Sequence, residues 1–95
     1  DTRGSTVVDE VKFREKMVQG EYGDVTVRNF APNHCEPIHT QEFGASVLVL
    51  KGEITITMED RSVTCWAGDV FALDANVPHA EQVGDEGVRF LACRK

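Results

Sequence analysis

The sequence has too few cysteines to form a disulfide framework. Its three cysteines, Cys35, Cys65 and Cys93, lie far apart and form no Cys-x-x-Cys pair, so neither a redox motif nor a structural zinc site is indicated. A free cysteine usually behaves as a small buried hydrophobic residue. We therefore expect reduced thiols in a cytoplasmic protein.

Basic residues and long apolar runs are also scarce. The net charge is −6, and the ten lysines and arginines are dispersed along the chain. Such a chain repels the phosphate backbone and offers no basic stripe, so a nucleic-acid partner is not expected. The longest apolar stretch, residues 45–50, is interrupted by Ser46 and is far too short to span a membrane. No charged-then-apolar leader opens the chain, so we expect no signal peptide and no membrane partner.

The length of 95 residues suits one domain, with residues 1–23 as a peripheral segment and residues 24–95 as the folded body. The apolar share of 41% and the charged share of 27% are ordinary for a globular protein. A chain of this size buries only roughly 60–65% of its unfolded surface. A second copy would add burial, which favours a homodimer.

Short extended runs separated by turn residues dominate the chain from Asp24 onward. Residues 25–30 alternate, with Val25 and Val27 on one face, and residues 46–50 are apolar on both faces. Turn residues such as Lys51-Gly52 follow at regular intervals. This spacing predicts an all-β sandwich or barrel. The expected strands are residues 25–30, 46–50, 53–58, 61–66, 70–73, 79–83 and 88–93.

The first twenty residues fit neither the helical nor the strand period well. We interpret Val7-Val8 and Lys16 to Gln19 as peripheral extended segments. A short helix near Glu10 to Glu15 is the alternative.

Two stretches of the sequence carry recognisable motifs. Residues 39–53, His-Thr-Gln-Glu-Phe-Gly-Ala-Ser-Val-Leu-Val-Leu-Lys-Gly-Glu, resemble the first cupin motif, which runs His-x-His, three or four residues, Glu, six residues, Gly. Residues 68–79 resemble the second, which opens Gly-Asp and ends Pro-x-Gly-x-x-His. The resemblance extends from about Phe30 to Cys93. It implies a double-stranded β-helix, or jelly-roll, barrel that forms homodimers, and activities that include metal-dependent dioxygenases and isomerases.

The candidate site combines residues from both motifs. Residues two apart in a strand share a face, so His39 and Gln41 would point together into the barrel, where His79 would meet them. Against the family pattern, Gln41 replaces the second histidine, and Ala45 replaces the metal-binding glutamate. We predict His39, Gln41 and His79 as ligands of a divalent transition metal, namely zinc, nickel, iron or manganese.

Two carboxylates could stand in for the one that Ala45 lacks. Glu42 would face outward in a regular strand and would need a bulge to turn inward. Glu81 is two residues past His79 and would share its face. We name Glu81 as the candidate catalytic residue, with a fourth metal ligand or a charge at the rim as the other roles.

Three functions are compatible with these residues. The first is a metal-dependent enzyme, a dioxygenase or an isomerase, that acts on a small organic molecule. The second is a metal-free, non-catalytic module that binds a small ligand, and the third is a structural domain with a filled barrel. A mostly apolar interior wall, made by Ala45, Val47, Val49 and Phe71, suits either of the first two.

Overall fold

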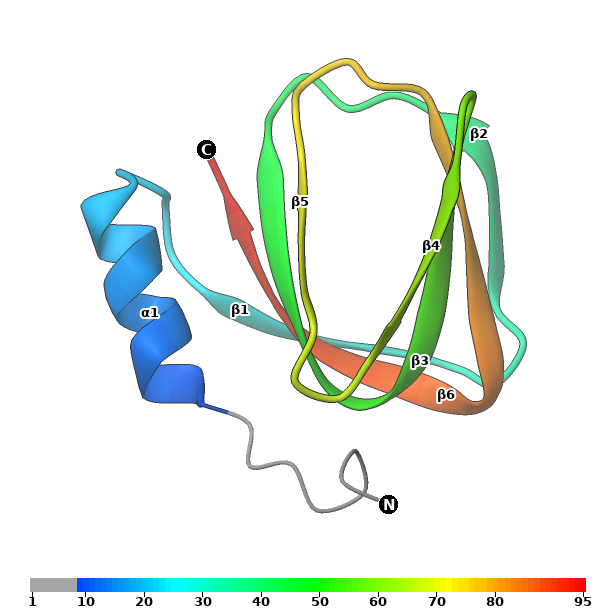
Figure 1. The fold of residues 1–95 in the computed structure, drawn as a ribbon, viewed down its shortest axis with the longest axis horizontal. Helices are drawn as coiled ribbons and strands as arrows, with labels where there is room; N and C mark the ends of the chain where they lie inside the picture. The colour runs from blue at the N-terminus through cyan, green and yellow to red at the C-terminus, as the bar shows by residue number, and fades with distance from the viewer. Residues whose placement is uncertain (1–8) are drawn as a thin grey trace.

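The fold is a helix followed by an antiparallel, six-stranded sheet that curls round on itself (Figure 1). The structure is a computed structural model, and it describes residues 9–95. The expected extended segment Val7-Val8 lies outside the described residues. The elements are α1 (Glu10–Gln19), β1 (Thr26–Phe30), β2 (Cys35–His39), β3 (Ala45–Met58), β4 (Ser62–Trp66), β5 (Val70–Leu73) and β6 (His79–Arg94).

Two long strands, β3 and β6, form the centre of the sheet. They pair antiparallel from Ala45 opposite Arg94 to Met58 opposite His79. The register shifts between Val49 and Lys51, and again between Gly52 and Ile54. The sequence predicted a turn at Lys51-Gly52 and a break around residues 84–87, and both predictions are wrong, because each segment is a bend inside a continuous strand.

The bends depend on two glycines that lie opposite each other. Gly52 has a φ of 81° and Gly87 a φ of 79°, a left-handed conformation that glycine adopts without steric cost. A Cβ atom added at Gly52 would overlap the backbone carbonyl of Gly87. This close approach lets the paired strands bend together, as bulged strands do at the corners of barrels.

Because the long strands bend, their two halves pair with different neighbours. The strand order is β1-β6-β3-β4, while β2 pairs with β6 and β5 pairs with β3. In β6, residues 88–92 pair with β1, and the earlier part of the strand pairs with β2. The strands therefore surround a common interior, as in a jelly-roll barrel, and the all-β prediction is confirmed (Figure 1).

The helix α1 lies against the outside of the sheet (Figure 1). The side chain of Asp9 caps it by accepting a hydrogen bond of 2.9 Å from the backbone N–H of Lys12. Phe13 and Met17, one helical turn apart, are its buried residues. The extended segment expected at Lys16 to Gln19 is therefore wrong, and the alternative helix is correct but continues to Gln19.

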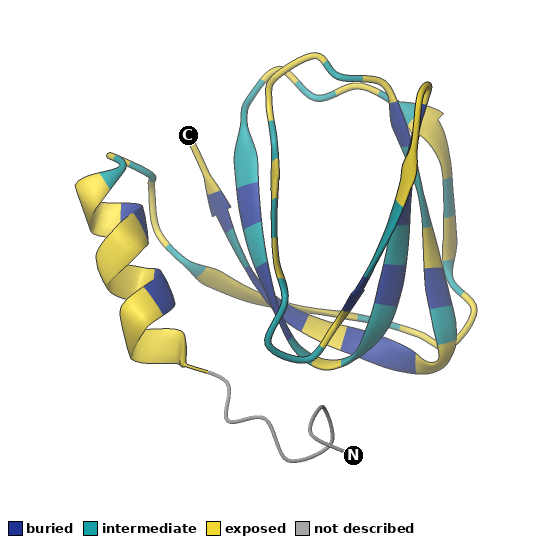
Figure 2. Cartoon of the chain, in the orientation of Figure 1, coloured by how far each residue is buried: buried dark blue, intermediate teal, exposed yellow. Residues whose placement is uncertain are grey.

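Buried side chains form two separate clusters. The buried positions lie on α1 and along the strands (Figure 2). The outer cluster lies under α1 and consists of Phe13, Met17, Leu48, Leu91 and Cys93. The inner cluster faces the barrel interior and consists of Val49, Ile54, Ile56, Met58, Cys65, Val83, Val88 and Phe90.

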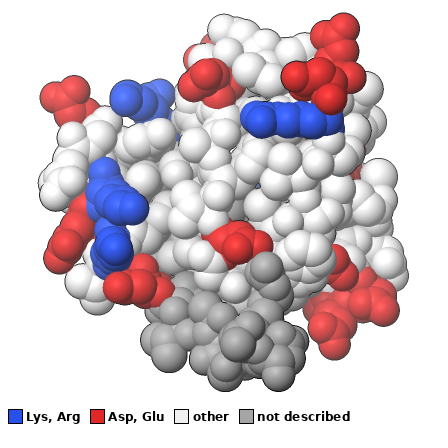
Figure 3. Space-filling view, viewed as in Figure 1, with Lys and Arg blue, Asp and Glu red and all other residues white. Residues whose placement is uncertain are grey.

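Charged side chains of both signs lie on the face shown in Figure 3. Lysines and arginines are interspersed there with acidic residues. Among residues 9–95, no helix has the length and apolar character needed to cross a membrane.

Candidate functional site

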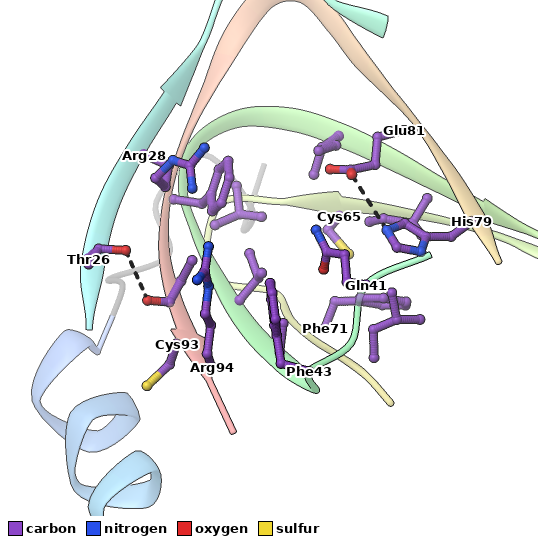
Figure 4. Close-up of a pocket in the computed structure, with 18 of the residues that line it drawn as sticks. Thr26, Arg28, Gln41, Phe43, Cys65, Phe71, His79, Glu81, Cys93 and Arg94 are labelled. Carbon is purple, nitrogen blue, oxygen red and sulfur yellow. Dashed lines mark hydrogen bonds and ion pairs between the residues drawn. The ribbon is translucent and has the colours of Figure 1, made fainter. Parts of the chain in front are cut away.

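The barrel interior contains a cavity of about 650 Å³ (Figure 4). Its wall is mainly apolar and includes Ala45, Val47, Val49 and Phe71, as the sequence predicted. Polar and charged side chains enter it at a few positions only. These are Asp24, Thr26, Arg28, Gln41, His79, Glu81 and Arg94.

His39 and His79 face each other across two paired strands. His39 ends β2, His79 begins β6, and the two residues are partners in the strand register. Their ring centroids lie 4.4 Å apart. The side chain of His79 is almost completely buried, while that of His39 is 32% exposed. The fold therefore brings together two imidazoles that are forty residues apart in the chain.

Backbone hydrogen bonds fix the orientation of both imidazoles. Nδ1 of His39 lies 2.8 Å from the carbonyl oxygen of Pro37, and Nδ1 of His79 lies 2.9 Å from that of Val77. A carbonyl oxygen can only accept, so each Nδ1 must carry a proton and donate it. In the neutral ring, Nε2 is then left with its lone pair, which is the arrangement found in metal-binding histidines.

Glu81 completes a group of three ligand atoms. It lies two residues past His79 in β6, and its side chain is 18% exposed and lines the cavity, as predicted from strand periodicity. Its Oε2 atom lies 3.6 Å from Nε2 of His79 and 3.7 Å from Nε2 of His39. Two ligand atoms that are each ~2.1 Å from one tetrahedral ion stand about 3.4 Å apart. The observed separations are close to that value.

The chemistry of these donors fits a transition metal. The ligand atoms of His39, His79 and Glu81 all lie within 4.8 Å of one another. Within the part of the chain that the structure describes, no other group of His, Cys, Asp or Glu side chains comes together in this way. Two imidazoles and one carboxylate form the facial triad known from non-haem iron sites, and the same donors suit zinc, nickel and manganese.

Gln41 reaches the cavity by a different route from the one predicted. Strand β2 ends at His39, so Gln41 lies in the following loop and not two places along the same strand. The backbone carbonyl of Gln41 accepts a hydrogen bond of 2.7 Å from the N–H of Asn76, and its side chain lines the same cavity as His79 and Glu81 (Figure 4). Its role as a metal ligand stays a prediction.

The two carboxylates that could replace the missing glutamate have different positions. Glu42 is exposed in the loop after β2 and is not part of the cavity wall. Ala45, at the family's glutamate position, lines the cavity with a methyl group only. Glu81 in β6 therefore supplies a carboxylate to the cavity in place of the one that is missing at Ala45 in β3.

The sequence interpretation missed two arginines in the cavity wall. Arg28 in β1 and Arg94 at the end of β6 both line the cavity (Figure 4). The sequence placed Val25 and Val27 on one face of this strand without saying which face is inner; in the structure Val27 is 46% exposed and Val25 packs against the outer cluster. The sequence did not show that β1 pairs with residues 88–92 of β6. This pairing determines which face of β1 meets the cavity.

The two buried thiols have raised pKa values and do not belong to the group of ligand atoms formed by His39, His79 and Glu81. Burial, followed by the nearby charge of Asp69, raises the pKa of Cys65 above its ordinary value. Burial and then Asp24 raise the pKa of Cys93, whose thiol donates to the carbonyl oxygen of Gly23 at 2.9 Å. The third cysteine, Cys35, is exposed, and all three are free.

Comparison with known proteins gives a family and a set of similar structures. Residues 26–93 match the family described as Cupin domain. A Rhizobium leguminosarum protein of unknown function has a similar structure, with a TM-score of 0.70 and 16% identity over 74% of this chain and 66% of that one. The sequence matches no curated protein.

Two similar structures carry named activities. The polyketide cyclase RemF from Streptomyces resistomycificus has a TM-score of 0.65 and 25% identity, over 74% of this chain and 51% of that one. The DMSP lyase DddQ from Ruegeria pomeroyi has a TM-score of 0.67 and 21% identity, over 75% of this chain and 36% of that one. The chain thus matches about a third to two thirds of the length of these structures.

Proposed function

Because the chain belongs to the cupin domain family, we propose that it is a metal-dependent enzyme that converts a small organic molecule inside its barrel. His39, His79 and Glu81 are the proposed ligands of one divalent transition metal, with Gln41 as an additional neutral donor. The observation that carries the proposal is the orientation of the two imidazoles. Each Nδ1 is bonded to a backbone carbonyl, and each Nε2 lies within 3.7 Å of the same carboxylate oxygen.

The residues in and around the cavity would have different roles in such an enzyme. A bound divalent transition metal supplies Lewis acidity and, where it is iron, the capacity to activate oxygen. The carbonyls of Pro37 and Val77 hold the imidazoles in the tautomer that leaves Nε2 unprotonated. The apolar wall keeps water away from the reacting end, which strengthens electrostatic interactions there.

Both reaction classes expected from the sequence, a dioxygenase and an isomerase, are compatible with this cavity. An isomerase needs a proton acceptor within hydrogen-bond reach of the substrate. When Glu81 serves as a ligand, Asp24 is the remaining carboxylate among the described residues that line the cavity. Asp24 belongs to the part of the wall near Arg94, because the neighbouring Gly23 donates a hydrogen bond to the Arg94 carbonyl.

The alternative function is a metal-free module that binds a small ligand without converting it. The predominantly apolar wall, with a few polar anchors, favours this function as much as an enzyme. In such a module, His39, Gln41 and His79 would orient the ligand through hydrogen bonds. Metal uptake separates the two proposals.

The test is metal uptake by tag-free protein that has been stripped with a chelator. We expect one ion per chain on titration with zinc, nickel, manganese and iron(II), the last under anaerobic conditions, as measured by elemental analysis and calorimetry. We also expect partial occupancy directly after purification, because the set lacks the carboxylate at Ala45. His79→Ala should abolish uptake, since it removes one of two imidazoles.

The matched control is His34→Ala. His34 lies outside the cavity and is paired with Glu36 at 2.8 Å, so its loss should leave uptake unchanged. If the intact protein binds no metal at neutral pH, or if both variants bind equally well, the enzyme proposal fails. The polar side chains would then be anchors for an organic ligand.

A further inference from the structure

The cavity has a second polar region, formed by two arginines. Arg28 projects from β1 and Arg94 from the last position of β6, and both line the cavity. Figure 4 shows their guanidinium groups on one side of the cavity and His79 and Glu81 on the other. The metal site proposed above and the arginines therefore occupy different parts of one binding space.

Neither arginine is neutralised by an ion pair. Among residues 9–95, no carboxylate lies within 4.0 Å of either guanidinium. Each instead lies over an aromatic ring: Arg94 is 4.2 Å from the ring centre of Phe43, and Arg28 is 5.8 Å from that of Phe30. Such stacking orients a guanidinium without using its hydrogen-bond donors.

The charge in this region favours a single negative group on the ligand. Asp24 is the one acidic residue among the described residues that line this part of the cavity. Two guanidinium groups and one carboxylate leave a formal surplus of one positive charge, in a protein whose net charge is −6. A guanidinium matches a carboxylate through two parallel hydrogen bonds.

The remainder of the wall favours a flat, apolar body. Four of the five phenylalanines line the cavity: Phe30, Phe43, Phe71 and Phe90. Aromatic side chains pack well against the faces and edges of other rings. A volume of about 650 Å³ is within the range of cavities that enclose a small organic ligand.

We propose that the cavity binds a small aromatic monocarboxylate, with its carboxylate at Arg28 and Arg94 and its ring among the phenylalanines. The opposite end of the ligand then points toward His39, His79 and Glu81. This inference names a substrate class for the proposed enzyme. It rests on the proposed function for the statement that the end of the ligand near His39, His79 and Glu81 is the end that reacts. The binding mode itself requires no metal.

The test compares 2-naphthoate with its uncharged counterpart 2-naphthamide, by calorimetry on metal-stripped protein. We expect 2-naphthoate to bind about tenfold more tightly, because hydrogen bonds between a guanidinium and a carboxylate are stronger than those between a guanidinium and an uncharged amide. Arg28→Gln and Arg94→Gln should each remove most of this preference, and Arg94→Lys should retain part of it. Because the two arginines lie on different strands, loss of folding in one variant leaves the other as a test.

Arg89→Gln is the control, since Arg89 is exposed like Arg28 and Arg94 but, unlike them, lies outside the cavity wall, so the variant removes the same charge from β6 without changing the cavity. It should keep the full preference for 2-naphthoate. The inference is overturned if the naphthamide binds equally well, or if Arg28→Gln and Arg94→Gln bind 2-naphthoate as the intact protein does. It is also overturned if the preference appears only in metal-loaded protein, because the metal would then bind the carboxylate.

Failure of the two proposals can be distinguished with His79→Ala. If this variant loses metal uptake and keeps the preference for 2-naphthoate, both proposals are supported. If the intact protein takes up no metal and still prefers 2-naphthoate, the proposed enzyme fails and the carboxylate site stands. If metal uptake is normal and the preference is missing, the carboxylate site alone fails.

Discussion

Leu48 and Val49 are neighbours in the chain and are both buried, yet they belong to different parts of the molecule. Leu48 lies in the outer cluster, where α1 closes over the sheet, and Val49 lies in the inner cluster, where the side chains line a cavity. The same alternation separates Phe90 from Leu91 in β6. One pair of strands thus has a packed face and a hollow face.

The difference indicates that side chains on the packed outer face contribute mainly to stability, whereas those on the inner face form the candidate site. A close-packed cluster loses contacts with every atom that is removed, whereas a side chain beside a cavity has fewer contacts to lose. The outer cluster contains no metal-ligand side chain except Cys93, whose thiol is bonded to Gly23. Of the three proposed strong ligands, His79 and Glu81 line the cavity, and His39 lies beside them at the end of β2 without being part of the cavity wall. Substitutions on the two faces should therefore have separable effects.

The largest expected effect is on the outer face. Leu91→Ala removes a completely buried side chain from the outer cluster and should lower the free energy of unfolding by about 2–5 kcal/mol. Phe71→Ala, in the cavity wall, should cost less, because Phe71 is only half-buried. Urea unfolding followed by circular dichroism measures both.

In the same experiment, folded Leu91→Ala should still bind metal with the affinity of the intact protein. Equal losses of stability in the two variants would contradict the division between the faces. A large loss of metal affinity in folded Leu91→Ala would contradict it as well.

A smaller effect is expected from a stronger ligand inside the cavity. Gln41→His replaces a neutral amide by an imidazole beside His79 and Glu81 and should tighten metal binding about tenfold, or about 1.4 kcal/mol. Chelator competition measures the affinity. Gln19→His adds an imidazole at the exposed end of α1 and should have no effect. Equal affinities for the Gln41 variant and the intact protein would show that this side chain does not reach the metal.

The smallest expected effect concerns thiol reactivity. Cys35 is exposed and should react first with a maleimide at pH 7. Cys65 and Cys93 should react slowly, because a raised pKa lowers the thiolate fraction at any given pH, and their rates should keep rising above pH 9. Peptide mass spectrometry resolves the three sites.

The labelling rates of the thiols also show which face of the sheet has lost packing in a variant. Leu91→Ala should accelerate labelling of Cys93, its neighbour in the outer cluster, more than labelling of Cys65 in the inner cluster. Labelling of Cys65 at the rate of Cys35 in the intact protein would show that the inner face is not closed around this thiol.

Much of the fold could be predicted from the sequence because its strands alternate and its two motifs are specific. The continuity of β3 and β6 could not, because a glycine in the left-handed conformation serves equally in a turn and in a bulge. Gly52 is a bulge residue only because Gly87 lies opposite, which is a contact between distant parts of the chain. The helix was only the alternative interpretation for a similar reason, since Phe13 and Met17 are buried against Leu48 and Leu91 and do not form a strong local pattern.

The candidate site was predictable in part. Glu81 was placed correctly because it shares the strand period of His79, and that rule holds in β6. The same rule failed for Gln41, because β2 ends at His39. Arg28 was missed because the alternation of residues 25–30 does not show which face of the strand is inner, and only the pairing of β1 with β6 shows which face meets the cavity.

The most direct test of the central claim is anomalous diffraction from crystals soaked with nickel and measured at the nickel absorption edge. The claim is that His39, His79 and Glu81 form one metal centre, of which His79 and Glu81 line the cavity. We predict a single strong peak in contact with Nε2 of both histidines and with the carboxylate of Glu81. Nickel bound at another position, with no peak between His39 and His79, would contradict the account.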